Sequence, residues 1–421
     1  MHLCMTFLKN ITIDITPLRR NRDFRLLFIG QFISFLGSSI TTVALSYQIY
    51  TITGSTAYVG ILGLFQLVPL SISGFIGGSV ADRLDRKRII VIAEVSLLLT
   101  SLALAVTAVM DHVPVAALFG IAAVSSFVSG FHRPALDALT PRVIGHDEIP
   151  AASALSGFRG TTAMILGPSI AGVILASAGL VFTYLLDALS FAVSILTVLL
   201  IRKQFQGERD EEGGFSFSHI ADGLRYAWSR KELLGTYFVD MMSMTTTYPY
   251  PLFPAIAAGY GSVTVLGSLH ASVAVGSFAA TLTSGWIRDV QRHGKAITLA
   301  ATGWCAGILC AGLSGPLWLM LFFFGVAGFA DMLSGMFRSI IWNQTIPDAI
   351  RGRMVGIEMI SYMSGPLLGG TLIGFAAAAS DSGTALSAGG AVGIAGILLL
   401  VLWLRQFWQY LPASAPTRNG N

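Results

Sequence analysis

The sequence predicts an all-α membrane protein of twelve transmembrane helices, arranged as two similar six-helix halves. Three observations support this. Of the 421 residues, 54% are hydrophobic and only 11% are charged, whereas about 25% of residues are charged in a soluble domain. Apolar windows long enough to cross a bilayer recur along the whole chain, and short motifs of the first half return in the second half. The windows are too uniformly apolar for a β-barrel, whose strands alternate over about ten residues.

A spanning helix needs about 20 apolar residues. The windows lie near 24–50, 56–80, 88–110, 114–138, 152–177, 180–201, 233–257, 262–287, 296–314, 316–341, 353–378 and 385–408. All 26 Lys and Arg residues lie in or beside alternate gaps between these windows. Because basic residues concentrate in cytoplasmic loops, the pattern predicts twelve spans with both termini in the cytoplasm. The same rule explains the pI of about 9.0 without a nucleic-acid partner.

The windows also define the expected domain organisation. We expect a cytoplasmic N-terminal segment (1–23), an N-terminal six-helix bundle (24–201), a cytoplasmic linker (202–232), a C-terminal six-helix bundle (233–408) and a cytoplasmic tail (409–421). The linker contains the polar run GERDEEGG (207–214), which is typical of a flexible connection. Apolar residues at helical spacing in 217–234 indicate either an amphipathic helix at the membrane surface or an extension of the seventh span.

Three pairs of short motifs relate the two halves. GGSVADRLDRK (77–87) matches SGWIRDVQRHGK (284–295), so that Gly78 and Asp82 correspond to Gly285 and Asp289. SGFHR (129–133) matches SGMFR (334–338), and Gly167–Pro168 matches Gly365–Pro366. Their common order indicates duplicated halves, which place a substrate path at the interface between the halves near the bilayer midplane.

The stretch GGSVADRLDRKR (77–88) resembles the loop signature of the major facilitator superfamily, which lies between the second and third helices. The residues that match it are Gly78, Asp82, Arg83, Arg86 and Lys87, whereas Asp85 stands where many members have glycine. The glycine lets two helices pack closely, and the family places the aspartate against the positive N-terminus of the eleventh helix, which here begins near Gly352. This resemblance implies the major facilitator fold.

Further stretches narrow the resemblance to one branch. RPALDALTPRVI (133–144), TYLLDALSF (183–191) and TIPDAIRGRMVG (345–356) resemble the bacterial enterobactin-exporter and macrolide-efflux branch. Gly167–Pro168 resembles a loose form of the motif associated with antiporters. The resemblance implies a multi-pass protein of the bacterial plasma membrane that exports a small molecule, without naming the substrate.

Ionisable residues inside a span are costly and usually functional. Asp240 lies eight residues past Glu232, which is roughly 12 Å along a helix. Such a depth is near the midplane of a hydrocarbon core about 30 Å thick. Low polarity favours the neutral acid, so this carboxyl can cycle between protonated and ionised forms. We expect it to be a proton or cation site with Tyr248 and nearby threonines as polar partners; a helix-to-helix hydrogen bond is the alternative.

Other polar residues in the windows are weaker candidates. Proton or substrate contacts are considered for Asp331, Asp187, Glu94, His270 and Gln31. For Asp187 and Glu94 a structural role is favoured, and a lone histidine is more often a packing residue.

A pair of charges near the end of the fourth window is a candidate gate. Arg133 and Asp137 are four residues apart and can pair on one helix face. This pair is either a cytoplasmic gate latch or a local ion pair.

The energy source must come from outside the chain, because no G-x-x-x-x-G-K-[S/T] motif occurs. A membrane enzyme is disfavoured because no H-E-x-x-H or G-x-S-x-G motif occurs, and duplicated halves disfavour a channel. The leading hypothesis is proton-coupled export of an amphipathic small molecule, such as a siderophore or a drug, by alternating access. An importer or a lipid flippase is the alternative. We expect the proton gradient in place of a cofactor, no metal, contact with lipid, and a monomer.

Overall fold

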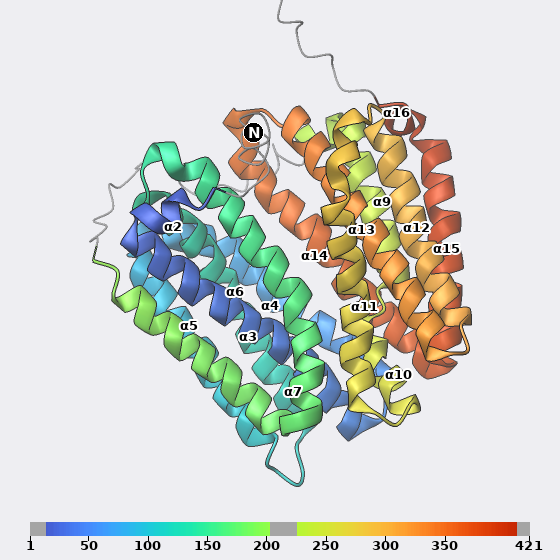
Figure 1. Ribbon diagram of the computed structural model, residues 1–421, viewed down its shortest axis with the longest axis horizontal. Helices are drawn as coiled ribbons and strands as arrows, with labels where there is room; N and C mark the ends of the chain where they lie inside the picture. The colour runs from blue at the N-terminus through green and yellow to red at the C-terminus, as the bar shows by residue number, and fades with distance from the viewer. Residues whose placement is uncertain (1–13, 203–224, 411–421) are drawn as a thin grey trace, which may run out of the picture. The chain divides into compact units, whose positions relative to one another are not determined.

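The computed structural model describes residues 14–202 and 225–410 of the chain. Within these ranges the side chains left undescribed are those of residues 75, 77–83, 146, 288, 348–353 and 355–361. The described residues fold into helices and connecting turns, with no strand among them (Figure 1). The chain separates into two compact units: the described parts of 1–48 and 68–214 form unit 1, and those of 49–67 and 215–421 form unit 2.

Unit 1 contains the helices of the first half of the chain. They are α2 (Thr16–Arg20), α3 (Arg22–Thr53), α4 (Thr56–Arg83), α5 (Arg86–Thr107), α6 (Val115–Val143), η1 (His146–Glu148) and α7 (Ile149–Leu199). The end of α3 and the start of α4 belong to unit 2. Large apolar side chains such as Val173 and Leu189 are exposed on the outside of these helices, as a lipid environment allows.

Helix α7 is a helical hairpin. Its 51 residues would extend for about 77 Å as a straight helix, more than twice the thickness of the hydrocarbon core. At Gly179 the backbone has φ 76° and ψ −178°, a conformation open to glycine and few other residues. Leu155 and Val198, near opposite ends of α7, lie in one apolar cluster, so the chain runs out and returns (Figure 1).

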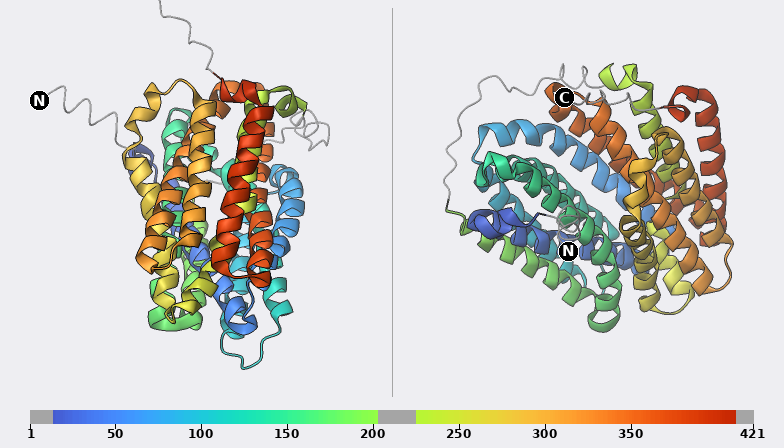
Figure 2. Two further views of the ribbon diagram at one scale, coloured as in Figure 1. Left: turned by 90° about the vertical axis from the view of Figure 1, so that its right-hand side faces the viewer. Right: turned by 45° about the horizontal axis from the view of Figure 1, so that its top comes forward.

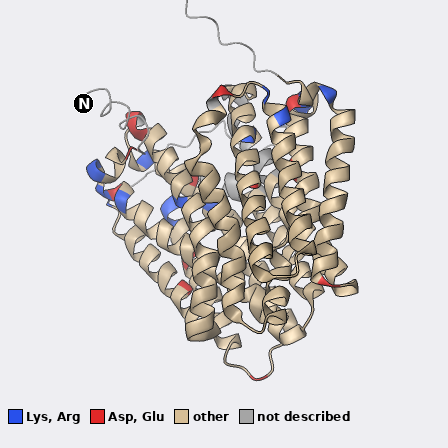
Figure 3. Cartoon of the chain, turned by 45° about the vertical axis from the view of Figure 1, so that its right-hand side comes forward, with Lys and Arg blue, Asp and Glu red and all other residues tan. Residues whose placement is uncertain are grey.

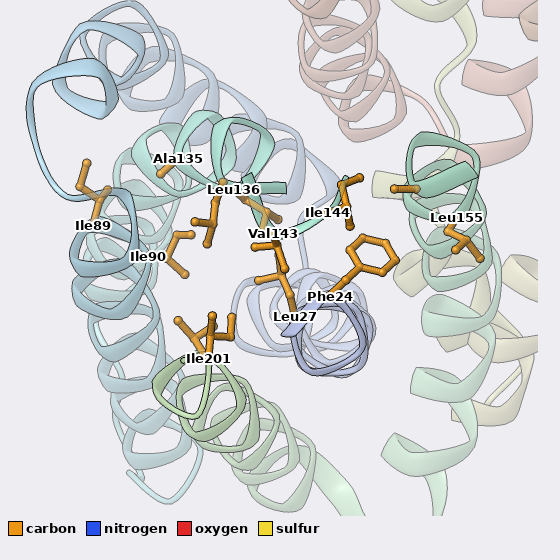
Figure 4. Close-up of a cluster of buried hydrophobic side chains, with 13 residues drawn as sticks. Phe24, Leu27, Ile89, Ile90, Ala135, Leu136, Val143, Ile144, Leu155 and Ile201 are labelled. Carbon is orange, nitrogen blue, oxygen red and sulfur yellow. The ribbon is translucent and has the colours of Figure 1, made fainter. Parts of the chain in front are cut away.

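An apolar cluster closes the end of unit 1 where α3 and α5 begin and α6 ends. Figure 4 shows Leu27 of α3 between Ile90 of α5 and the end of α6, whereas Phe24 of α3 lies beside Ile144. Leu155 joins the cluster from the first arm of α7 and Ile201 from the residues that follow the second arm. These side chains are at most 8% exposed, so an apolar core lies inside this end of the bundle.

Unit 2 contains the helices of the second half. They are α9 (Lys231–Thr247), η2 (Tyr250–Leu252), α10 (Phe253–Gly259), α11 (Val263–Leu282), η3 (Ser284–Asp289), α12 (His293–Leu313), α13 (Leu317–Thr345), α14 (Asp348–Ala379), α15 (Ser382–Trp403) and α16 (Arg405–Trp408). Figure 2 shows the long helices running alongside one another, with α12 packed between α13 and α15. Pro249 and Pro251 follow the end of α9, where proline cannot continue an α-helix.

The start of α4 packs against the end of α14 within unit 2. The hydroxyl of Thr56 donates to the carbonyl of Gly374 at 2.8 Å, and the hydroxyl of Thr371 donates to the carbonyl of Gly60 at 2.9 Å. A Cβ added to Gly60 would lie 3.1 Å from the Cα of Thr371. The two backbones therefore touch directly, as small residues permit between membrane helices.

Among the described residues, ten helices are long and apolar enough to span a membrane. The hairpin α7 counts once among them although it has two arms, and the 17-residue α9 is not included. The all-helical membrane fold is confirmed, whereas the number twelve stays a prediction. The predicted surface helix over 217–234 lies partly outside the described residues; 225–229 are helical.

Basic side chains gather near one end of the helices within each unit (Figure 3). In unit 1 this is the end that carries Arg22 at the start of α3, Arg86 at the start of α5 and Arg142 at the end of α6. In unit 2, Arg292 and Lys295 lie at the start of α12 and Arg405 follows α15. This distribution agrees with the gaps to which the sequence assigns the basic residues.

Candidate functional site

Asp240 of α9 and Arg338 of α13 form a buried ion pair. An Arg338 Nη1 group contacts Asp240 Oδ2, and Asp240 is only 4% exposed. Arg338 Nε is buried without a hydrogen-bond partner. Two opposite charges thus neutralise each other inside helices of membrane-spanning character, which is the usual condition for keeping charge in a membrane.

The polar partners expected for Asp240 are not the ones observed. The hydroxyls of Thr246 and Thr247 donate to backbone carbonyls of Met242 and Ser243 in their own helix. Hydroxyls in membrane helices commonly bond to the carbonyl one turn earlier, which removes them as carboxylate donors. A cation 98 residues away in the chain takes their place.

Asp331 lies seven residues before Arg338 in α13 and interacts electrostatically with both Arg338 and Asp240. It is half-buried and forms no ion pair of its own with the described residues. Tyr248 and Tyr250 both interact electrostatically with Asp331. The structure thereby brings together three candidates that the sequence identified separately: Asp240, Asp331 and Tyr248.

His270 of α11 belongs to an aromatic cluster beside this region. Its ring stacks on Tyr250, with ring centroids 5.3 Å apart, and meets the edge of Phe253 at 4.9 Å. Tyr248 and Tyr250 have centroids 4.8 Å apart. The Nδ1 atom of His270 is buried without a hydrogen-bond partner, so the ring is packed mainly by aromatic contacts, which favours the packing role.

Asp187 of α7 is surrounded by hydroxyl donors in unit 1. Thr41 donates to its Oδ2 at 2.8 Å and Ser101 at 2.7 Å. Ser190 lies 3.3 Å from Oδ1. A buried carboxyl with three hydroxyl partners joins α3, α5 and α7 through satisfied polar contacts, which favours the structural role expected for it.

Glu94 of α5 lies in a second polar cluster of unit 1, and it is fully buried. Its Oε1 accepts from Gln31 Nε2 of α3 at 2.5 Å and from Ser194 Oγ of α7 at 2.6 Å. His132 Nε2 of α6 lies 3.4 Å from the same oxygen. The sequence analysis identified Gln31 and Glu94 as candidates but did not predict their contact. It did not identify His132, although the position of this residue directly before Arg133 in the repeated motif could have indicated it.

The signature loop contributes helix-end contacts. Asp85 caps α5 by accepting from the backbone N–H of Lys87 at 2.9 Å, and a short polar residue is well suited to this position. Its departure from the family glycine therefore has a local purpose. Lys87 Nζ donates to the carbonyls of Leu199 and Ile201, at 3.1 and 2.8 Å, where a cation stabilises the end of α7.

The remaining loop positions are only partly described. Arg86 Nη1 donates to the carbonyl of Ala138 in α6 at 3.0 Å. The side chains of Gly78, Asp82 and Arg83, at the end of α4, lie outside the described set, as does the expected contact of Asp82 near Gly352.

The other gating candidates occupy different surroundings. Arg133 and Asp137 are both exposed on α6 and interact electrostatically with each other. Gly167 of α7 touches Ser39 of α3 so closely that a Cβ would clash, and Pro168 lies inside the same helix.

The second-half counterpart of the loop differs in structure. Gly285 and Asp289 lie in the 3₁₀ helix η3 rather than in an α-helix, and there is open space around Gly285.

No group of three metal-ligating side chains capable of holding an ion occurs in the described portion of the chain. The polar sites found are pairs and networks of titratable and hydroxyl groups. The contacts observed in them are ion pairs and hydrogen bonds.

Similar proteins agree with this architecture. The chain is 25% identical over 419 residues to the enterobactin exporter EntS of Salmonella typhi, covering 96% of this chain and 98% of that protein. It is 24% identical to the enterobactin exporter EntS of Citrobacter koseri, with the same coverage. Among solved structures, the nucleoside transporter NupG matches with a TM-score of 0.73 at 15% identity, covering 92% of this chain and 99% of that one.

A bacterial homologue of the human lysosomal transporter Spinster, in an inward-facing and unoccupied conformation, matches with a TM-score of 0.70 at 14% identity, covering 93% and 98% of the two chains. These two structures show the fold alone.

A family model described as transmembrane secretion effector matches residues 12–415. This is a transporter family and not an enzyme family. The chain therefore belongs to the transmembrane secretion effectors of the major facilitator superfamily.

Proposed function

We propose that the chain is a proton-coupled exporter of a small amphipathic molecule, a siderophore or a drug, that works by alternating access. The observation that carries the proposal is the buried Asp240–Arg338 ion pair with Asp331 beside it. A proton bound at Asp240 would cancel its charge and remove the attraction that holds Arg338.

The free energy of breaking the Asp240–Arg338 ion pair is similar to the free energy needed to shift a protein between two conformations. Removing one partner of a buried ion pair costs about 3–5 kcal/mol. Moving a two-state equilibrium from 1:99 to 99:1 takes about 5.5 kcal/mol. Protonation of Asp240 alone would thus shift the equilibrium most of the way, provided that the two conformations hold Arg338 differently.

Asp331 gives the released arginine a second carboxylate. It lies on the same helix as Arg338 and already interacts with it electrostatically. We infer that Arg338 alternates between Asp240 and Asp331 as Asp240 loses and gains its proton. Tyr248, beside Asp331, would contact the substrate.

The loop candidates are proposed to control the rate of interconversion. Asp85, Arg86 and Lys87 tie the start of α5 to α6 and to the end of α7, which supports movement of these helices as one body. Asp82 would be the group that engages and releases α14 in each cycle.

The proposal extends to location and organisation. The relatives from Salmonella and Citrobacter are named exporters of enterobactin, which supports a bacterial plasma membrane and outward transport of a siderophore. Both termini would be cytoplasmic, with six-helix bundles over 24–201 and 233–408 joined by the linker. The functional form would be a monomer with no cofactor.

Inside-out membrane vesicles test the direction and the energy source. With a proton gradient imposed, vesicles containing the protein are expected to accumulate enterobactin, and a protonophore should abolish the accumulation. The matched control is Asp381→Asn, because Asp381 is an exposed carboxylate that caps α15. Uptake that occurs only in right-side-out vesicles would support an importer instead, and gradient-independent transfer of labelled lipid would support a flippase.

A further inference from the structure

Four helices of unit 1 each contribute one side chain to the polar cluster around Glu94. Its members are Gln31 of α3, Glu94 of α5, His132 of α6 and Ser194 of α7. Each lies four residues, or one helical turn, from a member of the apolar cluster of Figure 4: Leu27, Ile90, Leu136 and Val198. The polar layer is therefore covered at the end of the bundle by a packed apolar layer.

The hydrogen bonds to Glu94 are one-sided. All three neighbours meet Oε1, whereas Oε2 is buried with no hydrogen-bond partner. An ionised carboxylate spreads its charge over both oxygens, and leaving one of them buried and unsolvated is costly. Neutralising the carboxyl with a proton would remove most of this cost. Gln31 and Ser194 donate to Oε1, and the third neighbour is the imidazole ring of His132.

His132 links this buried group to less buried surroundings. Its side chain is 15% exposed, compared with 0% for Glu94. Among the charged groups of these helices, Asp137 of α6 interacts electrostatically with His132, and also with Arg133 of α6 and Arg159 of α7. Gln31 and Ser194, the partners from α3 and α7, are uncharged. His132 is thus the titratable group through which a proton from water can reach Glu94.

The repeat places this pair on a helix equivalent to the one that carries Arg338. In the matched motifs SGFHR (129–133) and SGMFR (334–338), Arg133 corresponds to Arg338 and His132 to Phe337. Each half therefore has a buried carboxyl paired with a basic side chain of that motif: Glu94 with His132, and Asp240 with Arg338. The basic partner in unit 1 is a histidine, a side chain that can be neutral or charged, whereas arginine stays charged.

We propose that Glu94 and His132 form a second proton-binding site, separate from Asp240. A proton from water binds the neutral imidazole of His132, and the Nε2–H of the resulting imidazolium passes a proton to Glu94 Oε1. The products are a neutral imidazole and a neutral carboxyl, so the pair as a whole has gained one proton. Its role in transport rests on the proposed function, whereas its proton binding does not.

Infrared difference spectroscopy on the purified full-length protein tests proton binding without any substrate. Spectra at acidic minus alkaline pH are expected to contain a protonated-carboxyl band that Glu94→Gln removes and Asp240→Asn leaves in place. His132→Gln removes the imidazole that is proposed to deliver the proton, so after a jump to acidic pH its carboxyl band should appear more slowly than that of the wild type. A band unchanged by Glu94→Gln would overturn the proposal.

Proton flux tests the role in transport. Proteoliposomes with an entrapped pH dye are expected to show one proton fewer per enterobactin for Glu94→Gln than for the wild type. The matched control is Ser125→Ala, which removes a 2.8 Å hydrogen bond between α5 and α6 outside the cluster and should leave the ratio unchanged. An equal ratio in Glu94→Gln and wild type would overturn the role in coupling. If no preparation moves enterobactin, the proposed function fails while the infrared result still decides the site.

Discussion

Asp240→Asn is expected to abolish proton-coupled transport, while the protein still folds and inserts into the membrane with reduced stability. Asp240→Asn keeps the shape of the side chain and leaves the Arg338 charge without its partner at a site where Asp240 is 4% exposed. An unpaired buried charge costs about 3–5 kcal/mol, and arginine cannot relieve the cost by losing its proton. Pairing of Arg338 with Asp331 would offset part of this cost. In Arg338→Gln the remaining aspartate can become neutral by taking up a proton, so its loss of stability should be smaller.

The double variant Asp240→Asn/Arg338→Gln removes both charges, and it should recover most of the stability lost in Asp240→Asn. Thermal unfolding in lipid nanodiscs gives the order: wild type and double variant highest, Arg338→Gln next and Asp240→Asn lowest. All three variants should insert into the membrane, and all three should lose proton-driven accumulation of enterobactin. Uphill transport by Asp240→Asn at the normal rate would refute its assignment, and a double variant no more stable than Asp240→Asn would refute the pairing argument.

Three further predictions address the loop, the α4–α14 contact and a helix cap. Asp82→Asn should slow turnover more than it weakens substrate affinity; unchanged turnover in vesicles would count against its gating role. Cysteines at positions 60 and 371, placed in a background lacking the native cysteines, should cross-link under oxidation. The cross-link should stop transport reversibly, because the proposed alternating access moves the bundle over 24–201, which includes the start of α4, away from α14. Hydrogen bonds from Thr384 lower the pKa of Asp381 from 3.8. The ionised Asp381 therefore caps and stabilises α15 at neutral pH, and this stabilisation is lost as the pH falls below that value. The difference in stability between wild type and Asp381→Ala, measured by thermal unfolding, should disappear in acid.

The sequence predicted the membrane-spanning class well because the relevant signals are local. Apolar runs, prolines after α9 and alternate gaps of basic residues are read along one segment at a time. The windows 152–177 and 180–201 correspond to the two arms of α7. Apart from the presence of a glycine, the sequence contained no local signal that predicted the non-helical backbone conformation of Gly179.

The partners within the candidate sites could not be predicted in the same way. Asp240 meets Arg338 across 98 residues, and Glu94 meets Ser194 across 100. Such contacts depend on which faces of two helices turn toward each other, and uniformly apolar helices carry little periodic signal about their orientation. The nearby threonines were reasonable partners by proximity in sequence, but Thr246 and Thr247 bond to their own backbone and Thr245 Oγ1 is buried without a hydrogen-bond partner.

Direct measurement of proton movement during transport tests the central claim. Purified protein is placed in liposomes that contain a pH dye, and a gradient of enterobactin is imposed without any initial pH difference. The account predicts that enterobactin moving down its gradient drives protons in the opposite direction, and that Asp240→Asn abolishes the proton movement. Enterobactin flux that leaves the internal pH unchanged and ignores both pH gradient and membrane voltage would contradict it.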